Sequence, residues 1–146
     1  KIPVYGDGKN VRDWLFVEDH AKAIDMVQEQ GRLFETYNVG GHNEKQNIEI
    51  INIIIDTLQE MLPADDPRRA LVSKDLITYV EDRKGHDRRY AIAPDKIKAE
   101  IGWYPETDFA TGIKKTIAWF FEHEDWMKNV TSGDYQKYYE DMYANK

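Results

Sequence analysis

The sequence predicts a helix-rich protein of the α/β to α+β class with a few short strands. Long segments of helical period alternate with short runs of β-branched and aromatic residues, and glycines and prolines separate them. The chain has 146 residues, of which 41% are hydrophobic and 12% aromatic. It is therefore long and apolar enough to bury a core, and by length we expect one globular domain.

The first elements are a short strand and a helix. Residues Ile2 to Tyr5 form an extended run, which Pro3 restricts to an edge strand or extended loop because proline has no amide donor. The segment from Val17 to Gln30 predicts a helix that ends at Gly31. Its apolar face is expected on Ala21, Ile24 and Val27.

A second strand and helix follow. Thr36 to Val39 is typical of a short strand, and it ends in a double glycine. Asn47 is a good N-cap for a helix from Ile48 to Leu62, which Pro63 ends. This helix is apolar over more than half its circumference, so we expect it to be buried on more than one side.

The second half continues the pattern. Leu76 to Val80 predicts a strand, and Tyr90 to Ile92 is a further candidate. Pro94 fits the first turn of a helix that ends at Gly102, and residues 109–121 predict an amphipathic helix. A last helix is expected to carry a packing stripe of helical spacing, formed by Tyr135, Tyr138, Tyr139, Met142 and Tyr143.

Composition and charge exclude several classes of protein. The 20 Lys and Arg against 27 Asp and Glu give a net charge of −7, which argues against general affinity for nucleic acid or anionic membranes. There is no cysteine, so disulfides and thiol chemistry are excluded. No apolar run approaches the roughly 20 residues of a membrane span.

One loop concentrates positive charge in this acidic chain. Between Asp82 and Tyr90 lie three arginines, a lysine and a histidine, and Gly85 allows a sharp turn among them. Arginine presents a planar fork of donors that matches phosphate oxygens, so the loop is a candidate anion site. The alternative is a solvated loop whose cations pair with the surrounding acids.

A second loop near the N-terminus combines an aromatic residue with an arginine. Tyr5 can stack on a flat ring, and Arg12 can hold a phosphate. A tyrosine platform with separated arginines suits a nucleotide that carries a diphosphate. The alternatives are a packing role for Tyr5 and a salt bridge from Arg12 to Asp13 or Glu18.

Other catalytic signatures are missing. The chain has neither the glycine-rich fingerprint of a dinucleotide fold nor paired cysteines or H-E-x-x-H for a metal. A Tyr-x-x-x-Lys match at Tyr5 to Lys9 contains two glycines, which disfavour the helix that this motif needs.

The motifs together resemble the C-terminal part of the dTDP-glucose 4,6-dehydratases, enzymes of the extended short-chain dehydrogenase/reductase family. The resemblance covers nearly the whole chain and loosens between Thr57 and Ser73. The combination of R-D-W-x-x-V-E-D-H with G-H-D-R-R-Y is specific, whereas the first motif alone fits many nucleotide-sugar epimerases and dehydratases. The matching segments are 3–8, 12–15, 17–21, 37–44, Asn47, 82–83, 85–92, 102–103 and Pro105.

The resemblance implies that residues 1–146 are a nucleotide-sugar-binding portion without its N-terminal Rossmann domain, which would carry NAD and the catalytic residues. No catalytic residue is expected in this chain. The resemblance further implies a cytoplasmic parent lyase, active as a homodimer in deoxysugar (often rhamnose) biosynthesis, that binds a dTDP-sugar. The residues expected to bind this substrate are Ile2, Pro3, Val4, Tyr5, Arg12, Asn47, Asp82, Arg83, Lys84, Gly85 and His86.

Three further expectations follow from this reading. Arg12, Asn47, Arg83 and His86 should converge on one open groove, because a diphosphate must be held by several donors at once. Lys84 stands where the family usually has proline, so its loop should be less rigid. The helices 17–30 and 48–62 and the strand 36–39 should expose apolar surface toward the missing domain. The alternatives are another nucleotide-sugar epimerase or dehydratase, and a non-catalytic domain that grips an acidic partner.

Overall fold

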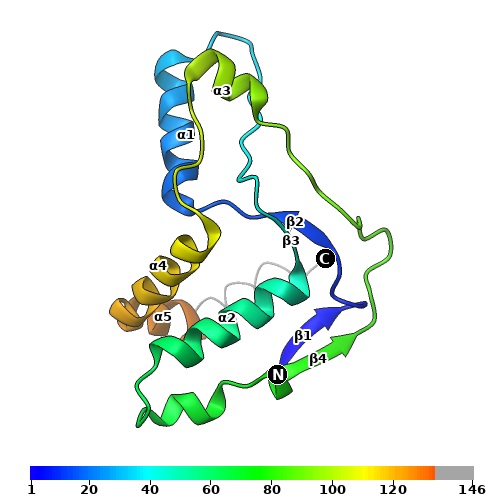
Figure 1. Cartoon of the computed structure of the whole chain (residues 1–146), viewed down its shortest axis with the longest axis vertical. Helices are drawn as coiled ribbons and strands as arrows, with labels where there is room; N and C mark the ends of the chain where they lie inside the picture. Colours follow the sequence, from blue (N-terminus) through cyan, green and yellow to red (C-terminus); the bar gives the residue numbers. More distant parts are fainter. Residues whose placement is uncertain (134–146) are drawn as a thin grey trace. The chain divides into compact units, whose positions relative to one another are not determined.

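The computed structural model describes residues 1–133 and divides the chain into two compact units, Lys1–Ile113 and Lys114–Lys146. Helices dominate, as Figure 1 shows, and the strands are short. The expected helix-rich class with few strands is therefore confirmed. The elements are β1 (Ile2–Tyr5), β2 (Val11–Asp13), α1 (Val17–Gln30), β3 (Glu44–Gln46), α2 (Asn47–Met61), the 3₁₀ turns η1 (Pro67–Leu71) and η2 (Lys74–Leu76), β4 (Ile77–Val80), α3 (Asp95–Ile101), α4 (Phe109–Glu122) and α5 (Glu124–Thr131).

Two small sheets organise the first unit. β1 pairs in parallel with β4, so that Ile2 lies opposite Ile77 and Tyr5 opposite Val80. β2 pairs antiparallel with β3, and Arg12 lies opposite Lys45. In the described part of the chain β1 has a strand on one side only, which is the edge position that Pro3 predicts.

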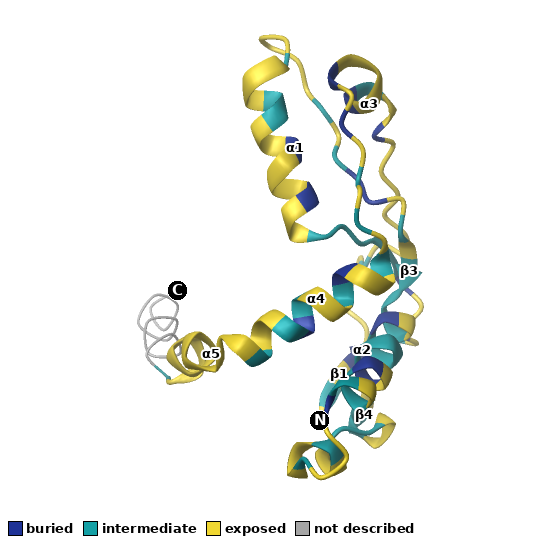
Figure 2. Cartoon of the chain, turned by 60° about the vertical axis from the view of Figure 1, so that its left-hand side comes forward, coloured by how far each residue is buried: buried dark blue, intermediate teal, exposed yellow. Residues whose placement is uncertain are grey.

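The core of the first unit forms where α1 packs against α3, which lie side by side in Figures 1 and 2. Gly102 ends α3 in the left-handed conformation (φ 79°), which turns the chain so that Trp103 enters the core. The buried members of this cluster are Ala23, Ile97, Ile101 and Trp103, with Leu15, Met26, Val27, Tyr37 and Val39 packed around them.

A buried carboxylate ties α1 to the segment after α3. Asp19 is 6% exposed, and its Oδ2 accepts a hydrogen bond from the Thr107 amide at 2.9 Å. The carbonyl oxygen of Asp19 also accepts from Trp103 Nε1 at 3.1 Å. The aspartate of the V-E-D-H motif, Asp19, thus fixes the start of α1 against the segment that follows α3.

The helix α2 begins with a capping box. The Gln46 side chain accepts a hydrogen bond from the Glu49 amide, and the Glu49 carboxylate accepts one from the Gln46 amide. The N-cap is therefore Gln46, and the expectation of Asn47 is wrong by one residue. Ile50, Ile55 and Thr57 are buried, and most of the other apolar positions are half-buried.

Four local expectations are wrong. Residues 36–39 are irregular rather than a strand, and residues 90–92 show only a neighbouring isolated bridge between Val11 and Arg89. A strand needs a neighbouring strand that bonds to it at successive residues. Within residues 1–133 no strand pairs with residues 36–39, and residues 90–92 make only the single backbone bond from the Tyr90 amide to the Val11 carbonyl. On α1 the covered face runs through Asp19 and Ala23, whereas Ala21 and Ile24 are exposed. Pro94 also stands at the N-cap of α3 rather than in its first turn.

The second unit holds the rest of α4 and the helix α5, which the sequence reading missed. Its aromatic rings contact one another. Trp119 stacks on His123 with ring centroids 4.3 Å apart, and it meets Trp126 edge to face at 5.1 Å. The expected tyrosine stripe from Tyr135 to Tyr143 lies outside the described residues. No helix within residues 1–133 has the length and apolar character needed to cross a membrane.

Removing the buried carboxylate should destabilise the first unit. We expect Asp19→Ala to lower the free energy of unfolding by about 1–3 kcal/mol, because the Thr107 amide then has no acceptor. Urea unfolding measures this change. His20→Ala removes the adjacent, exposed side chain and should change the stability by less than about 0.5 kcal/mol. Equal effects of the two substitutions would contradict the anchoring role.

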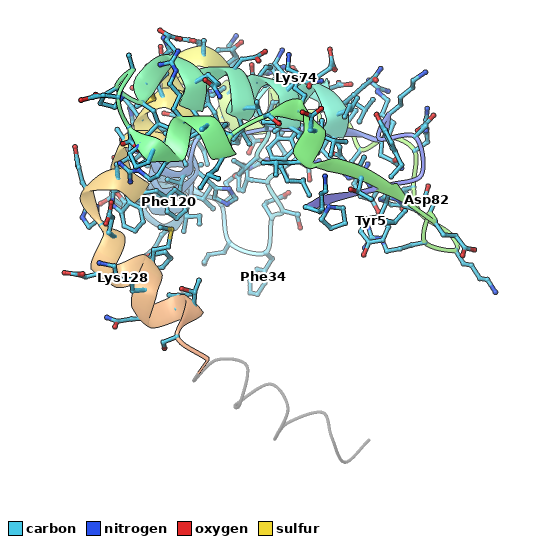
Figure 3. The ribbon with its side chains drawn as sticks, turned by 90° about the horizontal axis from the view of Figure 1, so that it is seen from below. Tyr5, Phe34, Lys74, Asp82, Phe120 and Lys128 are labelled. Carbon is cyan, nitrogen blue, oxygen red and sulfur yellow. The ribbon has the colours of Figure 1, made fainter. Side chains whose placement is uncertain are left out.

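A strained residue, Phe34, offers a test in which substitution should raise the stability. Phe34 adopts φ 65° and is fully exposed, and Figure 3 shows it pointing away from the ribbon. The left-handed conformation costs a residue with a Cβ roughly 1–2 kcal/mol, and glycine avoids that cost. Because glycine also gains freedom in the unfolded chain, we expect Phe34→Gly to raise stability by only about 0.5–1 kcal/mol.

The neighbouring Leu33 provides the matched control. It is 86% exposed and does not have a positive φ. Leu33→Gly should therefore lower stability slightly, and a gain equal to that of Phe34→Gly would show that lost apolar exposure, not relieved strain, is responsible.

Candidate nucleotide-binding site

The parallel strands bring the two candidate loops together. Because Tyr5 pairs with Val80, the chain leaves both strands at the same end of the sheet, where Figure 3 labels Tyr5 and Asp82. The Gly6 amide donates to the Val80 carbonyl at 2.9 Å. Gly6 has φ 57°, and a Cβ at this position would lie 2.8 Å from Asp82 Oδ2. Glycine therefore suits this position both by its positive φ and because it leaves the Asp82 carboxylate where it is.

A second set of backbone hydrogen bonds joins the far ends of the loops. The Val11 amide donates to the Arg88 carbonyl at 2.8 Å, and the Tyr90 amide donates to the Val11 carbonyl at 3.1 Å. The buried Asn10 adds a bond from its Nδ2 to the Asp87 carbonyl at 3.2 Å. Residues 5–12 and 82–90 therefore form one continuous surface.

Two arginines and a histidine meet on this surface. Arg12 Nη2 lies 3.0 Å from His86 Nε2, and Arg83 Nη2 lies 2.9 Å from the same nitrogen. The other ring nitrogen, Nδ1, lies 2.6 Å from Asp82 Oδ1. The hydrogen bond from His86 lowers the pKa of the Asp82 carboxyl below its ordinary value, so this group is ionised at neutral pH.

Each arginine also lies over an aromatic ring. Arg83 Cζ is 5.1 Å from the centroid of Tyr5, and Arg12 Cζ is 4.3 Å from the centroid of Tyr90. Both distances are within the range of a cation–π interaction. The Tyr90 hydroxyl donates to the Asp87 carboxylate, and that acceptor raises the pKa of Tyr90. Tyr90 was not among the expected site residues.

The remaining cations of the loop are paired. Arg88 makes two hydrogen bonds to the Asp7 carboxylate, at 2.7 and 3.0 Å, and Arg89 Nη2 lies 2.6 Å from Glu44 Oε2. These two arginines follow the alternative reading of a loop whose cations pair with acids. Within residues 1–133, by contrast, neither Arg12 nor Arg83 has a carboxylate partner. Their charges are available to an anion.

The proposed salt bridge from Arg12 to Asp13 does not form. Asp13 instead accepts from the Gly41 amide at 2.7 Å and from the Asn43 amide at 2.8 Å. It thereby holds the double-glycine segment against β2. Gly41 tolerates no side chain here, since a Cβ would lie 2.3 Å from the Trp14 carbonyl oxygen.

The other expected site residues are placed as follows. Asn47 lies opposite Asn10, whose carbonyl accepts from the Asn47 amide at 3.0 Å, but in the described structure its side chain makes no hydrogen bond to the arginine cluster. Along β1, Pro3 and Tyr5 share the exposed face, while Val4 is 3% exposed and Ile2 half-buried. Lys84 is exposed, and Gly85 turns the loop at φ 72°.

The described part of the chain, residues 1–133, holds neither a metal-ligand cluster nor a cradle for NAD. No group of three or more acidic, histidine or cysteine side chains in residues 1–133 is arranged around a common point. The turn at residues 6–8 leads from β1 into the strand β2, not into a helix. A dinucleotide cradle needs a helix N-terminus at that position, so the residues present do not fit NAD.

Curated relatives of this chain are dehydratases. It is 48% identical over 145 residues to the dTDP-glucose 4,6-dehydratase of Shigella flexneri, a match that covers 99% of this chain and 39% of that protein. The enzyme of the same description from Neisseria meningitidis is 48% identical over 135 residues, covering 92% of this chain and 38% of the relative. The chain thus spans well under half the length of the relatives it matches.

Solved structures agree with this match. A dTDP-glucose 4,6-dehydratase from Bacillus anthracis in complex with NAD has a TM-score of 0.72 and 46% identity, over 86% of this chain and 36% of that one. The enzyme from Streptomyces venezuelae with NAD and TYD bound has a TM-score of 0.73 and 37% identity, over 86% and 35%. The sequence also matches the family model described as GDP-mannose 4,6 dehydratase over residues 1–116. The chain therefore belongs to the GDP-mannose 4,6 dehydratase family.

Proposed function

We propose that residues 1–146 are the C-terminal, nucleotide-sugar-binding portion of a dTDP-glucose 4,6-dehydratase. The parent protein would be a cytoplasmic, homodimeric lyase that converts dTDP-glucose to dTDP-4-dehydro-6-deoxyglucose and water with the help of tightly bound NAD. The NAD and the catalytic residues belong to an N-terminal Rossmann domain, which matches nothing in this chain. Deoxysugar biosynthesis, including the rhamnose route, is the proposed pathway.

The observation that carries this proposal is the pair of arginines without carboxylate partners. Arg12 and Arg83 both reach His86 Nε2, so their forks lie close enough to bind one diphosphate. The exposed face of Pro3 and Tyr5 adjoins them and provides an apolar and aromatic surface for a base. Asn47, Lys84 and the Gly85 turn are proposed to contact the nucleotide when it is bound.

The surfaces that would meet the missing domain are also consistent with the proposal. On α1, Val17 is 70% exposed and Ile24 57% exposed, and most of this helix is exposed in Figure 2. Residues 36–39 pair with no strand within residues 1–133, which leaves room for a neighbouring strand from outside this chain. These features favour a portion of a larger protein over a free-standing interaction domain.

Substituting an unpaired arginine should weaken nucleotide binding. We expect Arg83→Ala or Arg12→Ala in the full protein to weaken dTDP binding by about 10- to 100-fold, because each loses a charge-assisted hydrogen bond of roughly 1.5–3 kcal/mol. Isothermal titration with dTDP measures the change. Arg88→Ala removes the same charge from the same loop but breaks only the pair with Asp7, and should leave the affinity within about twofold.

The outcomes separate the candidate functions. An affinity for dTDP that is insensitive to Arg83→Ala would refute the site, and a preference for UDP or GDP over dTDP would favour another nucleotide-sugar enzyme of the family. A protein that binds none of the three nucleotides would support the alternative function, a non-catalytic domain that binds an acidic partner.

The isolated 146-residue chain should not turn over dTDP-glucose, because the cradle that binds NAD is missing from it. A coupled assay for loss of dTDP-glucose, with added NAD, measures this. Turnover by the pure chain above the level of a buffer blank would contradict the assignment of catalysis to the N-terminal domain.

A further inference from the structure

The His86 imidazole is held at both of its nitrogens. Nδ1 faces the Asp82 carboxylate at 2.6 Å, and Nε2 faces Arg12 and Arg83 at 3.0 and 2.9 Å. The side chain of His86 is only 7% exposed, whereas that of Asp82 is 39% exposed. The ring is therefore enclosed by one anion and two cations, of which Arg12 comes from β2 and the other two from the loop that carries His86 itself.

These partners permit one arrangement of protons. A guanidinium has donors only, so His86 Nε2 must present its lone pair to both arginines. An ionised carboxylate has acceptors only, so Nδ1 must carry the proton and donate it to Asp82. A second proton on Nε2 would place an N–H group and a positive charge against two guanidinium groups.

We infer that Asp82 is a positioning residue, which fixes the tautomer of His86 and through it holds Arg12 and Arg83 ready for a diphosphate. The inference rests on the proposed nucleotide-binding function. It changes the role expected for Asp82: the carboxylate acts through the imidazole and does not touch the ligand. A diphosphate that is itself an anion would be repelled by Asp82, which makes direct contact unfavourable.

The carboxylate is fixed on several sides, as a positioning group must be. Asp82 Oδ1 also accepts from the Arg83 amide at 2.8 Å, and the missing Cβ of Gly6 makes space for Oδ2. The arginines are restrained from the other side by the rings of Tyr5 and Tyr90. Arg12 Nη2 additionally donates to the Asp87 carbonyl at 3.1 Å.

This arrangement reduces the cost of binding. Two long side chains are already ordered before the ligand arrives, so less conformational freedom is lost on association. Phosphate oxygens carry negative charge and the imidazole nitrogen does not, so phosphate oxygens are the stronger acceptors. The guanidinium groups of Arg12 and Arg83 can therefore exchange their hydrogen bonds to His86 Nε2 for hydrogen bonds to the ligand.

The test is Asp82→Asn in the full protein, with dTDP as the probe. The amide of asparagine can donate to Nδ1, which allows the proton to move to Nε2 and turns a donor toward the arginines. We expect dTDP binding to weaken about 10-fold. Glu81→Gln is the matched control, because it removes one negative charge from the adjacent exposed residue, and it should leave the affinity unchanged.

Two further readouts distinguish positioning from a merely structural role. Nitrogen-15 NMR of the imidazole should show a neutral ring protonated on Nδ1 in the unsubstituted protein and a shift toward the Nε2-protonated form in Asp82→Asn. In a His86→Gln background, whose amide oxygen can accept from the arginines, Asp82→Asn should have no additional effect on dTDP affinity.

The outcomes are separable from those of the proposed function. A ring protonated on Nε2 in the unsubstituted protein, or full additivity of Asp82→Asn and His86→Gln, would overturn the positioning role while dTDP binding persisted. Absence of dTDP binding in the unsubstituted protein would overturn the nucleotide function, and the positioning role with it.

Discussion

The pairing of β1 with β4 is the constraint on which the rest of the site depends. It joins the N-terminal residues to a strand that begins at Ile77, and its parallel register makes both strands end at the same place. The loops that follow are then joined by backbone hydrogen bonds from Gly6 and Val11. Side chains that are far apart in the sequence, Arg12 and Arg83, therefore reach the same imidazole nitrogen.

The acidic residues of the motifs differ in the groups that they bind. Asp13 and Asp19 accept from backbone amides and anchor the double-glycine segment and the start of α1. Asp7 neutralises Arg88, and this hydrogen bond holds the pKa of the Asp7 carboxyl well below its ordinary value. Asp82 alone among these four faces a histidine, and it leaves the neighbouring arginines free of carboxylates. A chain of net charge −7 thus keeps two cations available in one place.

Local patterns predicted the parts of the fold that local forces decide. The helix at 17–30 has the expected bounds, and the expected helix at 109–121 extends one residue further, to Glu122. The helical period of each segment, and Gly31 directly after the first, are local signals that need no distant partner. The strand expected at 36–39 is absent because β structure depends on a neighbour that sequence alone does not supply. The N-cap of α2 moved from Asn47 to Gln46 because the reciprocal bonds with Glu49 outweigh the preference for asparagine.

The site was predicted only in part for the same reason. The resemblance identified Arg12, Arg83 and His86, which do converge, but nothing in the run of charges separates Arg83 from Arg88 or Arg89. Their different roles depend on which acids the distant segments 5–12 and 44–46 bring near them. Tyr90 and Asn10 were missed because their contacts arise from the register between the loops and not from any motif.

The most direct test of this account is a crystal structure of the full protein with dTDP bound. The account predicts that diphosphate oxygens lie at about 2.7–2.9 Å from guanidinium nitrogens of both Arg12 and Arg83, with the Asp82 carboxylate still on His86 Nδ1. A diphosphate bound elsewhere, with both arginines still directed at His86, would contradict it.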